Sequence, residues 1–431
     1  MDYLAAWGRY KDLTIKDLPE EVVTVASQCI QDWFGCAVAG STEPLAQILR
    51  EQFGYRSGAC TVIGSDLKLD APTAALLNGA SGHALDFDDT GSRTGCHSTA
   101  PVLPAALAVA EEMGLSSDVL LTAFVVGVEI EGRISHAMGT DHYPRGWHTT
   151  ATFGAFGATA AVAHLLELDQ EHYAIAMGLA ASHASGVKAN FGTMTKPLHP
   201  GHAAESGINC ARLAAAGFTA NPAAVMGNQG FVQASSNGVD RTADLIAVAD
   251  EWLILGTLFK FHAACHLTHS AIESVLKMRT TLNVDELSSM TITVNPGLLD
   301  ICGIEEPRTG LEGKFSLRGT ASLALNGIDT SSPDTYVDDV ISSEAVQSLI
   351  PKVTVETDKA LTQFQSRVVW VDASQNAHEE FCDMSIPATD LEAQGDKLAQ
   401  KFSSLVSFGD ADENAMSAKV RKILTSQQVH L

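Results

Sequence analysis

Apolar residues recur at the spacing of an amphipathic helix through about the first 250 positions of the chain. The stretch 20–39 is the clearest example, because Pro19 suits the start of a helix and Gly40 suits its end. Its apolar positions are Val22, Val25, Cys29, Ile30, Trp33, Phe34 and Ala37. The same period predicts further helices over 71–84, 101–113, 117–136, 148–168, 170–184 and 202–216.

The hydrophobic pattern changes near Lys260. Alternation and β-branched residues, which are typical of strands, occur over 290–294, 353–356 and 367–372. Helical periodicity is found over 314–325, 389–405 and 413–424. We therefore predict a mainly α protein with an inserted α+β domain. Residues 1–261 and 386–431 would form a large all-helical domain, and residues 262–385 a smaller α+β domain.

Composition narrows the possible functions. The 431 residues are 45% hydrophobic and 18% charged, which provides a large core and excludes disorder for most of the chain. There are 27 Lys and Arg against 51 Asp and Glu, a formal net charge of −24. A protein this acidic does not bind nucleic acid or an anionic membrane through its bulk charge. An anionic substrate would need cations gathered locally.

The sequence predicts a cytoplasmic protein. Its first residues have neither a basic segment nor an apolar segment of the signal-peptide type. The longest apolar run, 119–128, is too short to span a bilayer. The eight cysteines form no CxxC pair, which favours reduced thiols over a disulfide framework.

Two neighbouring segments contain candidate chemistry. The first, 82–90, reads GHALDFDDT and places three aspartates within four residues. The pair Asp86 and Asp88 matches the nucleophile motif of aspartate-dependent phosphatases, but the preceding residues predict a helix where that chemistry needs a strand. Capping of a helix start is the structural alternative. The second segment, 93–97, carries Arg93 and His97 in a glycine-containing loop, where a histidine can reach a pocket.

Three more segments concentrate cations and histidines. The segment 142–148 carries Tyr143 and His148 just before a helix rich in Ala and Gly, whose first amides suit an anion. The segment 190–202 frames Lys196 with threonines and prolines but lacks the order of a phosphate-binding loop. The segment 260–269 offers a zinc site as an alternative to a polar hinge at the domain boundary; its candidate ligands are His262, Cys265, His266 and His269.

These residues suggest one pocket. If Arg93, His97, His148 and Lys196 converge, they form a cationic cleft for a small di- or tricarboxylate. Groups that titrate near neutrality could remove a proton next to a carboxylate, and fixed cations would stabilise the carbanion. Asp86 would orient a histidine or lysine, or bind a substrate hydroxyl. Dehydration, decarboxylation and epimerisation are the possible outcomes, and no metal or redox cofactor is expected.

Other classes remain open. The chain has no GxSxG, GxGxxG or Walker sequence, which disfavours serine hydrolysis, hydride transfer and nucleotide-driven chemistry. A metal-dependent hydrolase, a magnesium-dependent phosphatase and a non-catalytic carboxylate binder are the rival hypotheses.

Four segments together resemble the MmgE/PrpD family. They are HALDFDDT at 83–90, GWHTTATFGAFGATAA at 146–161, NFGTMTKPLHPGHAAESG at 190–207 and EGKFSL at 312–317. This family includes 2-methylcitrate dehydratase, cis-aconitate decarboxylase and iminodisuccinate epimerase. The resemblance implies a helical domain with an α+β lid domain, a homodimer, and a cofactor-free site in the cleft between the domains.

The resemblance also assigns residues. The family's site aspartate and threonine fall on Asp86 and Thr90, its two histidines on His97 and His148, and its lysine on Lys196. The decarboxylase's hinge histidine falls on Cys265, beside His266, and its tyrosine falls near Gly319, beside Arg318. The predicted catalytic residues are Asp86, His97, His148 and Lys196. The predicted substrate-binding residues are Thr90, Arg93, Tyr143, Lys260, Cys265 and His266.

The two departures disfavour the decarboxylase, and the GWH and NFGTMTKP segments of the 146–161 and 190–207 blocks look more like the epimerase and its relatives. We expect a lyase that abstracts a proton next to a carboxylate, in the manner of a 2-methylcitrate dehydratase. An iminodisuccinate-type epimerase or a cis-aconitate-type decarboxylase is the alternative within the family.

Overall fold

The computed structural model describes residues 3–237, 245 and 248–431. The chain divides into two compact units, Met1–Phe259 with Ala388–Leu431, and Lys260–Pro387. The first unit is mostly helical, and the second combines helices with a sheet.

The helices of the first unit surround a central helix, α7 (Thr149–Leu165), all of whose residues are buried. Small side chains along α7 allow α5, α6, α8 and α9 to contact it. The other α-helices before residue 238 are α1 (Tyr3–Tyr10), α2 (Glu20–Gly40), α3 (Pro44–Phe53), α4 (Ala71–Gly82), α5 (Thr99–Met113), α6 (Ser117–Met138), α8 (Gln170–His183), α9 (Thr195–Ala215) and α10 (Phe231–Ser235). Two short antiparallel pairs accompany them: β1 (Cys60–Thr61) with β2 (Lys68–Leu69), and β3 (Thr90–Gly91) with β4 (Thr257–Leu258).

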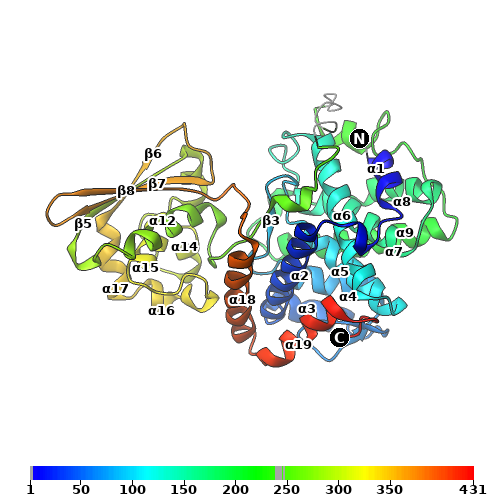
Figure 1. Cartoon of the computed structure of the whole chain (residues 1–431), viewed down its shortest axis with the longest axis horizontal. Coiled ribbons are helices and arrows are strands. Elements are labelled where there is room, and N and C mark those ends of the chain that lie inside the picture. Colours follow the sequence, from blue (N-terminus) through cyan, green and yellow to red (C-terminus); the bar gives the residue numbers. More distant parts are fainter. Residues whose placement is uncertain (1–2, 238–244, 246–247) are drawn as a thin grey trace. The chain divides into compact units, whose positions relative to one another are not determined.

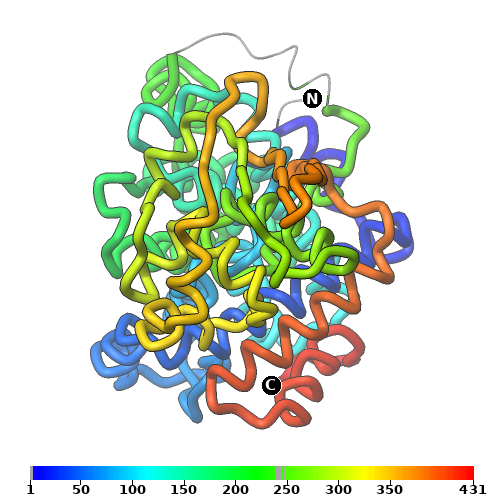
Figure 2. The backbone as a smooth tube through the Cα atoms, turned by 90° about the vertical axis from the view of Figure 1, so that its left-hand side faces the viewer, coloured from blue at the N-terminus to red at the C-terminus, as the bar shows by residue number. Residues whose placement is uncertain are grey.

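The last two helices return to the first unit. The helix α18 (Leu391–Phe408) packs along α2, and α19 (Glu413–Thr425) contacts α18, α2 and α6 (Figures 1 and 2). Residues far apart in the sequence therefore share one core, which includes Leu398 and Leu405 of α18.

The helix α9 begins earlier than the pattern predicts, at Thr195 and not at residue 202. Pro197 lies in the first turn, where the missing N–H would have no partner in the helix. Pro200 lies inside the helix and cannot donate to the carbonyl of Lys196. The prolines obscured the helical period, and Lys196 is consequently a first-turn residue and not a loop residue.

The second unit contains a four-stranded sheet in the order β6-β5-β7-β8. The strand β5 (Leu287–Val294) pairs parallel with β6 (Val353–Thr357) and antiparallel with β7 (Gln365–Asp372). Alternate residues of β7 are buried, including Val368 and Trp370, because one face of the sheet packs on α12 (His269–Arg279). The other helices are α13 (Leu299–Cys302), α14 (Gly310–Lys314), α15 (Leu317–Leu325), α16 (Asp338–Ile341) and α17 (Glu344–Leu349).

The structure adds an edge strand that the pattern does not predict. The strand β8 (Ala377–Asp383) pairs antiparallel with β7, and none of its residues is fully buried. Its sequence, AHEEFCD, has no apolar alternation, because an exposed edge strand needs none. The helix predicted over 314–325 begins at Leu317, as α15, and Lys314 is the last residue of the preceding helix α14.

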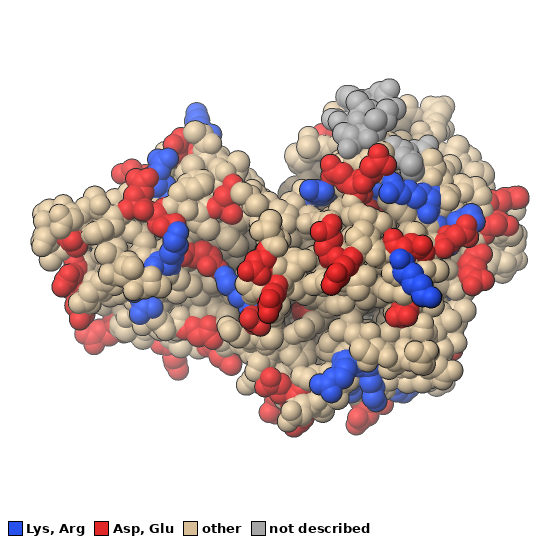
Figure 3. Space-filling model, viewed as in Figure 1, with Lys and Arg blue, Asp and Glu red and all other residues tan. Residues whose placement is uncertain are grey.

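None of the helices in the described ranges is both long and apolar enough to cross a bilayer. On the face shown in Figure 3, basic side chains are interspersed with acidic ones and form no extended basic patch.

Candidate active site

The amino-terminal ends of three helices meet in the first unit. His97 lies two residues before α5, His148 is the N-cap residue of α7, and Lys196 is the second residue of α9. Hydrogen bonds join the first two ends: the His97 backbone N–H donates to Thr150 Oγ1, at 3.1 Å, and Thr149 Oγ1 donates to the Gly95 carbonyl, at 2.8 Å. The amino-terminal end of a helix carries partial positive charge, so this place favours an anion without any basic surface patch.

Asp86 contacts two of the four residues that the sequence predicts to form a cationic cleft. Its Oδ2 atom lies 2.9 Å from Lys196 Nζ, and its Oδ1 atom lies 3.6 Å from His97 Nε2. The side chain of Asp86 is 46% exposed, so a ligand can reach it. Its φ of +52° is in the left-handed region, which Asp tolerates better than most residues.

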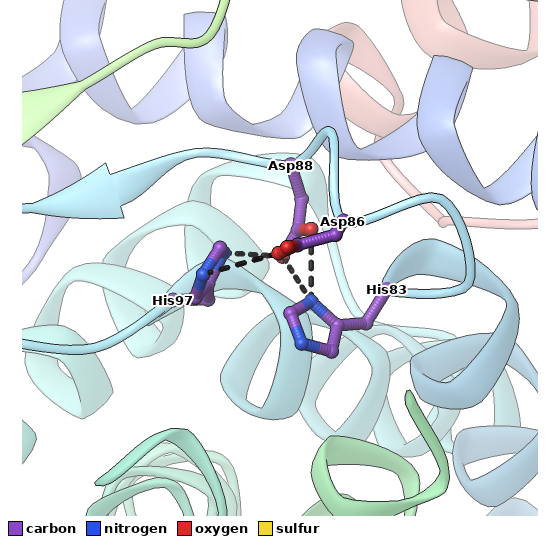
Figure 4. Close-up of side chains that lie close together, drawn as sticks. All are labelled: His83, Asp86, Asp88 and His97. Atoms are coloured by element: carbon purple, nitrogen blue, oxygen red, sulfur yellow. Dashed lines mark hydrogen bonds and ion pairs between the residues drawn. The ribbon is translucent and has the colours of Figure 1, made fainter. Parts of the chain in front are cut away.

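Asp88 lies between two imidazoles (Figure 4). His83 Nδ1 is 2.9 Å and 3.0 Å from the two carboxylate oxygens, and His97 Nδ1 is 3.1 Å from Oδ2. Burial alone would raise the pKa of the Asp88 carboxyl, but the two imidazoles and their hydrogen bonds lower it well below its usual value. Burial lowers the pKa of His83, although Asp88 opposes this effect.

His148 forms a second pair, with His199 of α9. Their Nδ1 atoms are 3.0 Å apart, so one ring must donate a proton and the other must accept it. Burial lowers the pKa of His148 well below its ordinary value, and the charges of His83 and Lys196 add to this effect. Burial, followed by neighbouring charge, lowers the pKa of His199 to about 4. Both rings are therefore neutral at pH 7.

Three predicted site residues of the first unit make other contacts. Arg93 Nη1 lies 2.6 Å from Glu251 Oε2, so its charge is already paired at the surface. Lys188 Nζ lies 3.5 Å from the centre of the Tyr143 ring, which is largely exposed. Thr90 belongs to β3, and its Oγ1 is 3.5 Å from the Leu258 carbonyl.

Lys260, Cys265 and His266 belong to the second unit. Lys260 and His266 are buried, and Cys265 is half-buried. The ring of His266 packs edge-on against His269, with centroids 4.8 Å apart. The tyrosine that the resemblance implies has no counterpart at Gly319, because glycine has no side chain and Gly319 lies buried in α15.

The zinc alternative for 260–269 gains no support from the geometry. His262 Nδ1 hydrogen-bonds to Thr330 Oγ1 at 2.8 Å, and His269 Nε2 is 3.3 Å from the Ala264 carbonyl. Within the described ranges, the group of metal-ligand atoms that come within 4.8 Å of one another lies elsewhere. It consists of His83, Asp86, Asp88 and His97.

These four side chains have the donor types that a transition metal accepts. Hydrogen bonds and an ion pair account for the short distances between these side chains. Asp88 accepts N–H donors from both imidazoles. The ammonium of Lys196 already compensates the charge of Asp86 and would repel a cation bound there.

The phosphatase interpretation also requires a feature that the fold lacks. Asp86 follows α4 through the C-cap residue His83, where a phosphatase would place its aspartate after a buried parallel strand. The chemistry of the group is instead that of carboxylate binding and proton transfer. A lysine and helix ends attract the anion, and imidazoles beside a carboxylate exchange protons.

Sequence reasoning did not include His83, Asp88 and His199 among the predicted site residues, and it considered Asp88 only as part of a phosphatase motif. All three lie inside the segments 82–90 and 190–202 that it examined. The available signal was a histidine five residues before an aspartate across a helix end, and a second histidine three residues after Lys196. Neither spacing means anything until the partner residues are known.

Comparison with known proteins identifies the family. Residues 4–243 match the MmgE/PrpD N-terminal domain, and residues 262–425 match the MmgE/PrpD C-terminal domain. The chain belongs to the MmgE/PrpD family.

Its similar relatives include cis-aconitate decarboxylases. The human enzyme is 32% identical over 277 residues, which are 62% of this chain and 57% of the human one. The cis-aconitate decarboxylase of Aspergillus terreus is 28% identical over 341 residues, covering 73% of this chain and 69% of the relative. A cis-aconitate decarboxylase-like protein of Aspergillus oryzae is 29% identical over 373 residues, covering 80% and 77%. The matched region thus spans little more than half of the human relative.

Proposed function

We propose that this protein is a lyase that removes CO₂ from a small unsaturated tricarboxylate of the cis-aconitate type. The observation that carries the proposal is that His97 and Lys196 both contact Asp86, while His148 packs on His83 with ring centroids 5.9 Å apart. His97, His148 and Lys196 lie at the starts of three helices. The names of the relatives favour decarboxylation over the dehydration of 2-methylcitrate that we expected from the sequence.

The proposed site binds the substrate by charge. Lys196 and the first amides of α5, α7 and α9 attract the carboxylates, and Asp86 keeps the ammonium of Lys196 in place. Burial keeps His148 and His199 neutral, so they orient polar groups without adding positive charge. Such fixed charges and dipoles stabilise a developing anion with little reorganisation.

The reaction then balances as follows. The bond between a carboxylate and its carbon breaks, CO₂ leaves, and the electron pair stays on carbon next to a remaining unsaturated acid group. In this proposal the positive charge of Lys196 stabilises that carbanion, and His97 returns a proton to it through Nε2; their contacts with the same carboxylate, Asp86, support these roles. One proton from solvent is consumed for each CO₂ released.

Dehydration and epimerisation remain the second candidates. Asp86 is an exposed carboxylate between a lysine and an imidazole, and this arrangement would also serve to bind the hydroxyl of a 2-methylcitrate-type substrate. The homodimer and the cytoplasmic location stay predictions from the sequence.

The test is a substrate panel in D₂O, in which cis-aconitate, citrate, 2-methylcitrate and iminodisuccinate are each incubated with the protein. We expect NMR to show CO₂ release from cis-aconitate and a five-carbon unsaturated diacid with one deuterium on carbon. A new alkene from 2-methylcitrate would indicate the dehydratase instead, and inverted iminodisuccinate the epimerase. Activity lost to a chelator and restored by zinc would favour a hydrolase or another metal enzyme.

The variant Lys196→Ala tests the site itself. We expect kcat/KM to fall by at least about 10²-fold, because the cation that stabilises the carbanion is gone. Lys188→Ala is the matched control: Lys188 is close in sequence but lies over Tyr143, and we expect a change of less than about 3-fold. Wild-type activity in Lys196→Ala would show that the site is misplaced.

A further inference from the structure

The carboxylate of Asp88 has no access to solvent. Asp88 is 0% exposed and His83 is 1% exposed, so neither side chain is placed to touch a substrate from solvent. Figure 4 shows their arrangement: Asp88 stands between the rings of His83 and His97, which pack edge to face with centroids 4.6 Å apart. A buried carboxylate is costly unless each oxygen is hydrogen-bonded, so its presence here calls for a function.

The protonation states follow from donor and acceptor rules. An ionised carboxylate only accepts hydrogen bonds, so the Nδ1 atoms of both His83 and His97 must carry a hydrogen. Burial disfavours the charged form of His83, although Asp88 opposes this effect. The Nε2 atom of His83 is buried and makes no hydrogen bond within the described part of the chain.

The same rule decides which atom of His97 can act. Because Nδ1 is committed to Asp88, Nε2 is the nitrogen through which His97 exchanges a proton. That atom faces Asp86 Oδ1 at 3.6 Å, and the other oxygen of Asp86 contacts Lys196. Proton transfer at the site would thus run through a single nitrogen of fixed direction.

We propose that Asp88 and His83 are positioning residues that hold His97 in its Nδ1–H tautomer, so that Nε2 is the atom that returns the proton to carbon. His83 binds both oxygens of Asp88 and prevents the carboxylate from turning away from His97. The catalytic part of this inference rests on the proposed function, whereas the tautomers exist without any substrate.

Asp88→Asn is the decisive variant. An amide has one accepting oxygen and one donating NH₂ group, so at least one imidazole must face the NH₂ group and move its proton to Nε2. We expect kcat to fall by roughly 10²–10⁴-fold, the scale of a tautomer error in another aspartate–histidine pair. KM should change by less than about 3-fold, because Asp88 does not touch the substrate.

Two further variants separate positioning from packing. His83→Asn places an amide N–H where Nδ1 was, so it should keep Asp88 in position and retain activity within about 10-fold. His83→Phe removes the donor but keeps a ring, and its kcat should fall as in Asp88→Asn.

Asp89→Asn is the matched control, because Asp89 is the next residue after Asp88 and is also buried. Burial raises the pKa of the Asp89 carboxyl, so an amide mimics its protonated form. It should keep wild-type kcat.

Histidine-selective ¹⁵N NMR of the full-length protein reads the tautomers directly, in the absence of substrate. We expect both His83 and His97 as Nδ1–H in the wild type, and at least one of them as Nε2–H in Asp88→Asn with its circular dichroism unchanged. The inference is overturned if wild-type His97 carries its hydrogen on Nε2, or if Asp88→Asn keeps the wild-type tautomers. It is equally overturned if Asp88→Asn keeps the wild-type kcat and pH profile. Correct tautomers in a protein that decarboxylates nothing would refute the proposed function alone.

Discussion

Lys401 supports the loop that carries Asp86 and Asp88. Its Nζ atom lies 2.6 Å from Asp32 Oδ1 and donates to the carbonyl of Phe87 at 2.6 Å. Both side chains of this ion pair are buried, at 1% and 0% exposure. Successive residues of the loop therefore have different partners. The carboxylates of Asp86 and Asp88 face the imidazoles of the candidate site, and the Phe87 carbonyl accepts a hydrogen bond from α18.

Replacing Lys401 by methionine should destabilise the protein strongly. The charge of Asp32 would stay buried without its partner, and breaking such a pair costs about 3–5 kcal/mol. Urea unfolding measures this loss, with Lys397→Met on the exposed face of the same helix as a control expected to change stability by less than about 0.5 kcal/mol. The double variant Lys401→Met, Asp32→Leu should recover much of the loss. Additive losses in the double variant would contradict a pairwise interaction.

At this scale the sequence located part of the site. Asp86, His97, His148 and Lys196 stood out because reactive residue types are concentrated in their segments, and the structure brings them together. Their orienting partners did not stand out. Asp88 matters because it hydrogen-bonds to the rings of His83 and His97. The spacing of these residues in the sequence does not show that their side chains meet.

The helices α7 and α9 approach one another closely. A Cβ atom placed on Gly207 of α9 would lie 2.5 Å from Ala158 Cβ and 2.7 Å from the backbone of Ala158 on α7. Backbone atoms cannot turn aside as a flexible side chain can. Because His148 is the N-cap residue of α7 and Lys196 is the second residue of α9, the distance between these two helices affects the geometry of the candidate site.

Gly207→Ala should therefore weaken both stability and activity. We expect a loss of about 1–3 kcal/mol in the free energy of unfolding, which is typical of overpacking, together with a lower kcat/KM. Gly8→Ala is the control, since nothing lies within 4 Å of that position on α1, and alanine should stabilise the helix by up to about 1 kcal/mol. Thermal unfolding and steady-state kinetics of both variants check this; an equally stable Gly207→Ala would mean that the helices can separate freely.

Elements with a strong hydrophobic period were predictable, and the others were not. The helix α2 ends at Gly40 and α6 begins at Ser117, as the pattern indicates. The start of α9 was missed because its prolines resemble a loop, and β8 was missed because an edge strand buries too little to show alternation. Both errors arise where tertiary contacts decide what local sequence leaves open.

The whole molecule should lose stability in mild acid. Burial lowers the pKa of His164, and that of His199, to about 4, against an unfolded value near 6.5. Between pH 6.5 and 4 the unfolded chain binds protons that the folded protein does not, so the free energy of unfolding falls as pH falls. Each histidine accounts for a fall of up to about 3 kcal/mol in the free energy of unfolding between pH 6.5 and pH 4. Above pH 6.5 it adds no further pH dependence.

His164→Leu tests this pH dependence without touching the candidate site. The slope of unfolding free energy against pH, measured by urea unfolding between pH 4 and 6.5, should decrease by up to about 1.4 kcal/mol per pH unit. The exposed His183, changed to Gln, should leave the slope unaltered. An unchanged slope in His164→Leu would mean that His164 takes up its proton in the folded state.

The sequence by itself determined the class of this protein: helical and strand periods, an acid excess that leaves cations only in local clusters, and the segments typical of the MmgE/PrpD family. Only the tertiary structure decided which nitrogen faces which carboxylate. The physical reason is the separation along the chain of the residues that interact. Periodicity and composition reflect interactions between near neighbours in the chain, whereas the tautomer of His97 and the pairing of His148 with His199 depend on contacts of about 3 Å between residues brought together by folding.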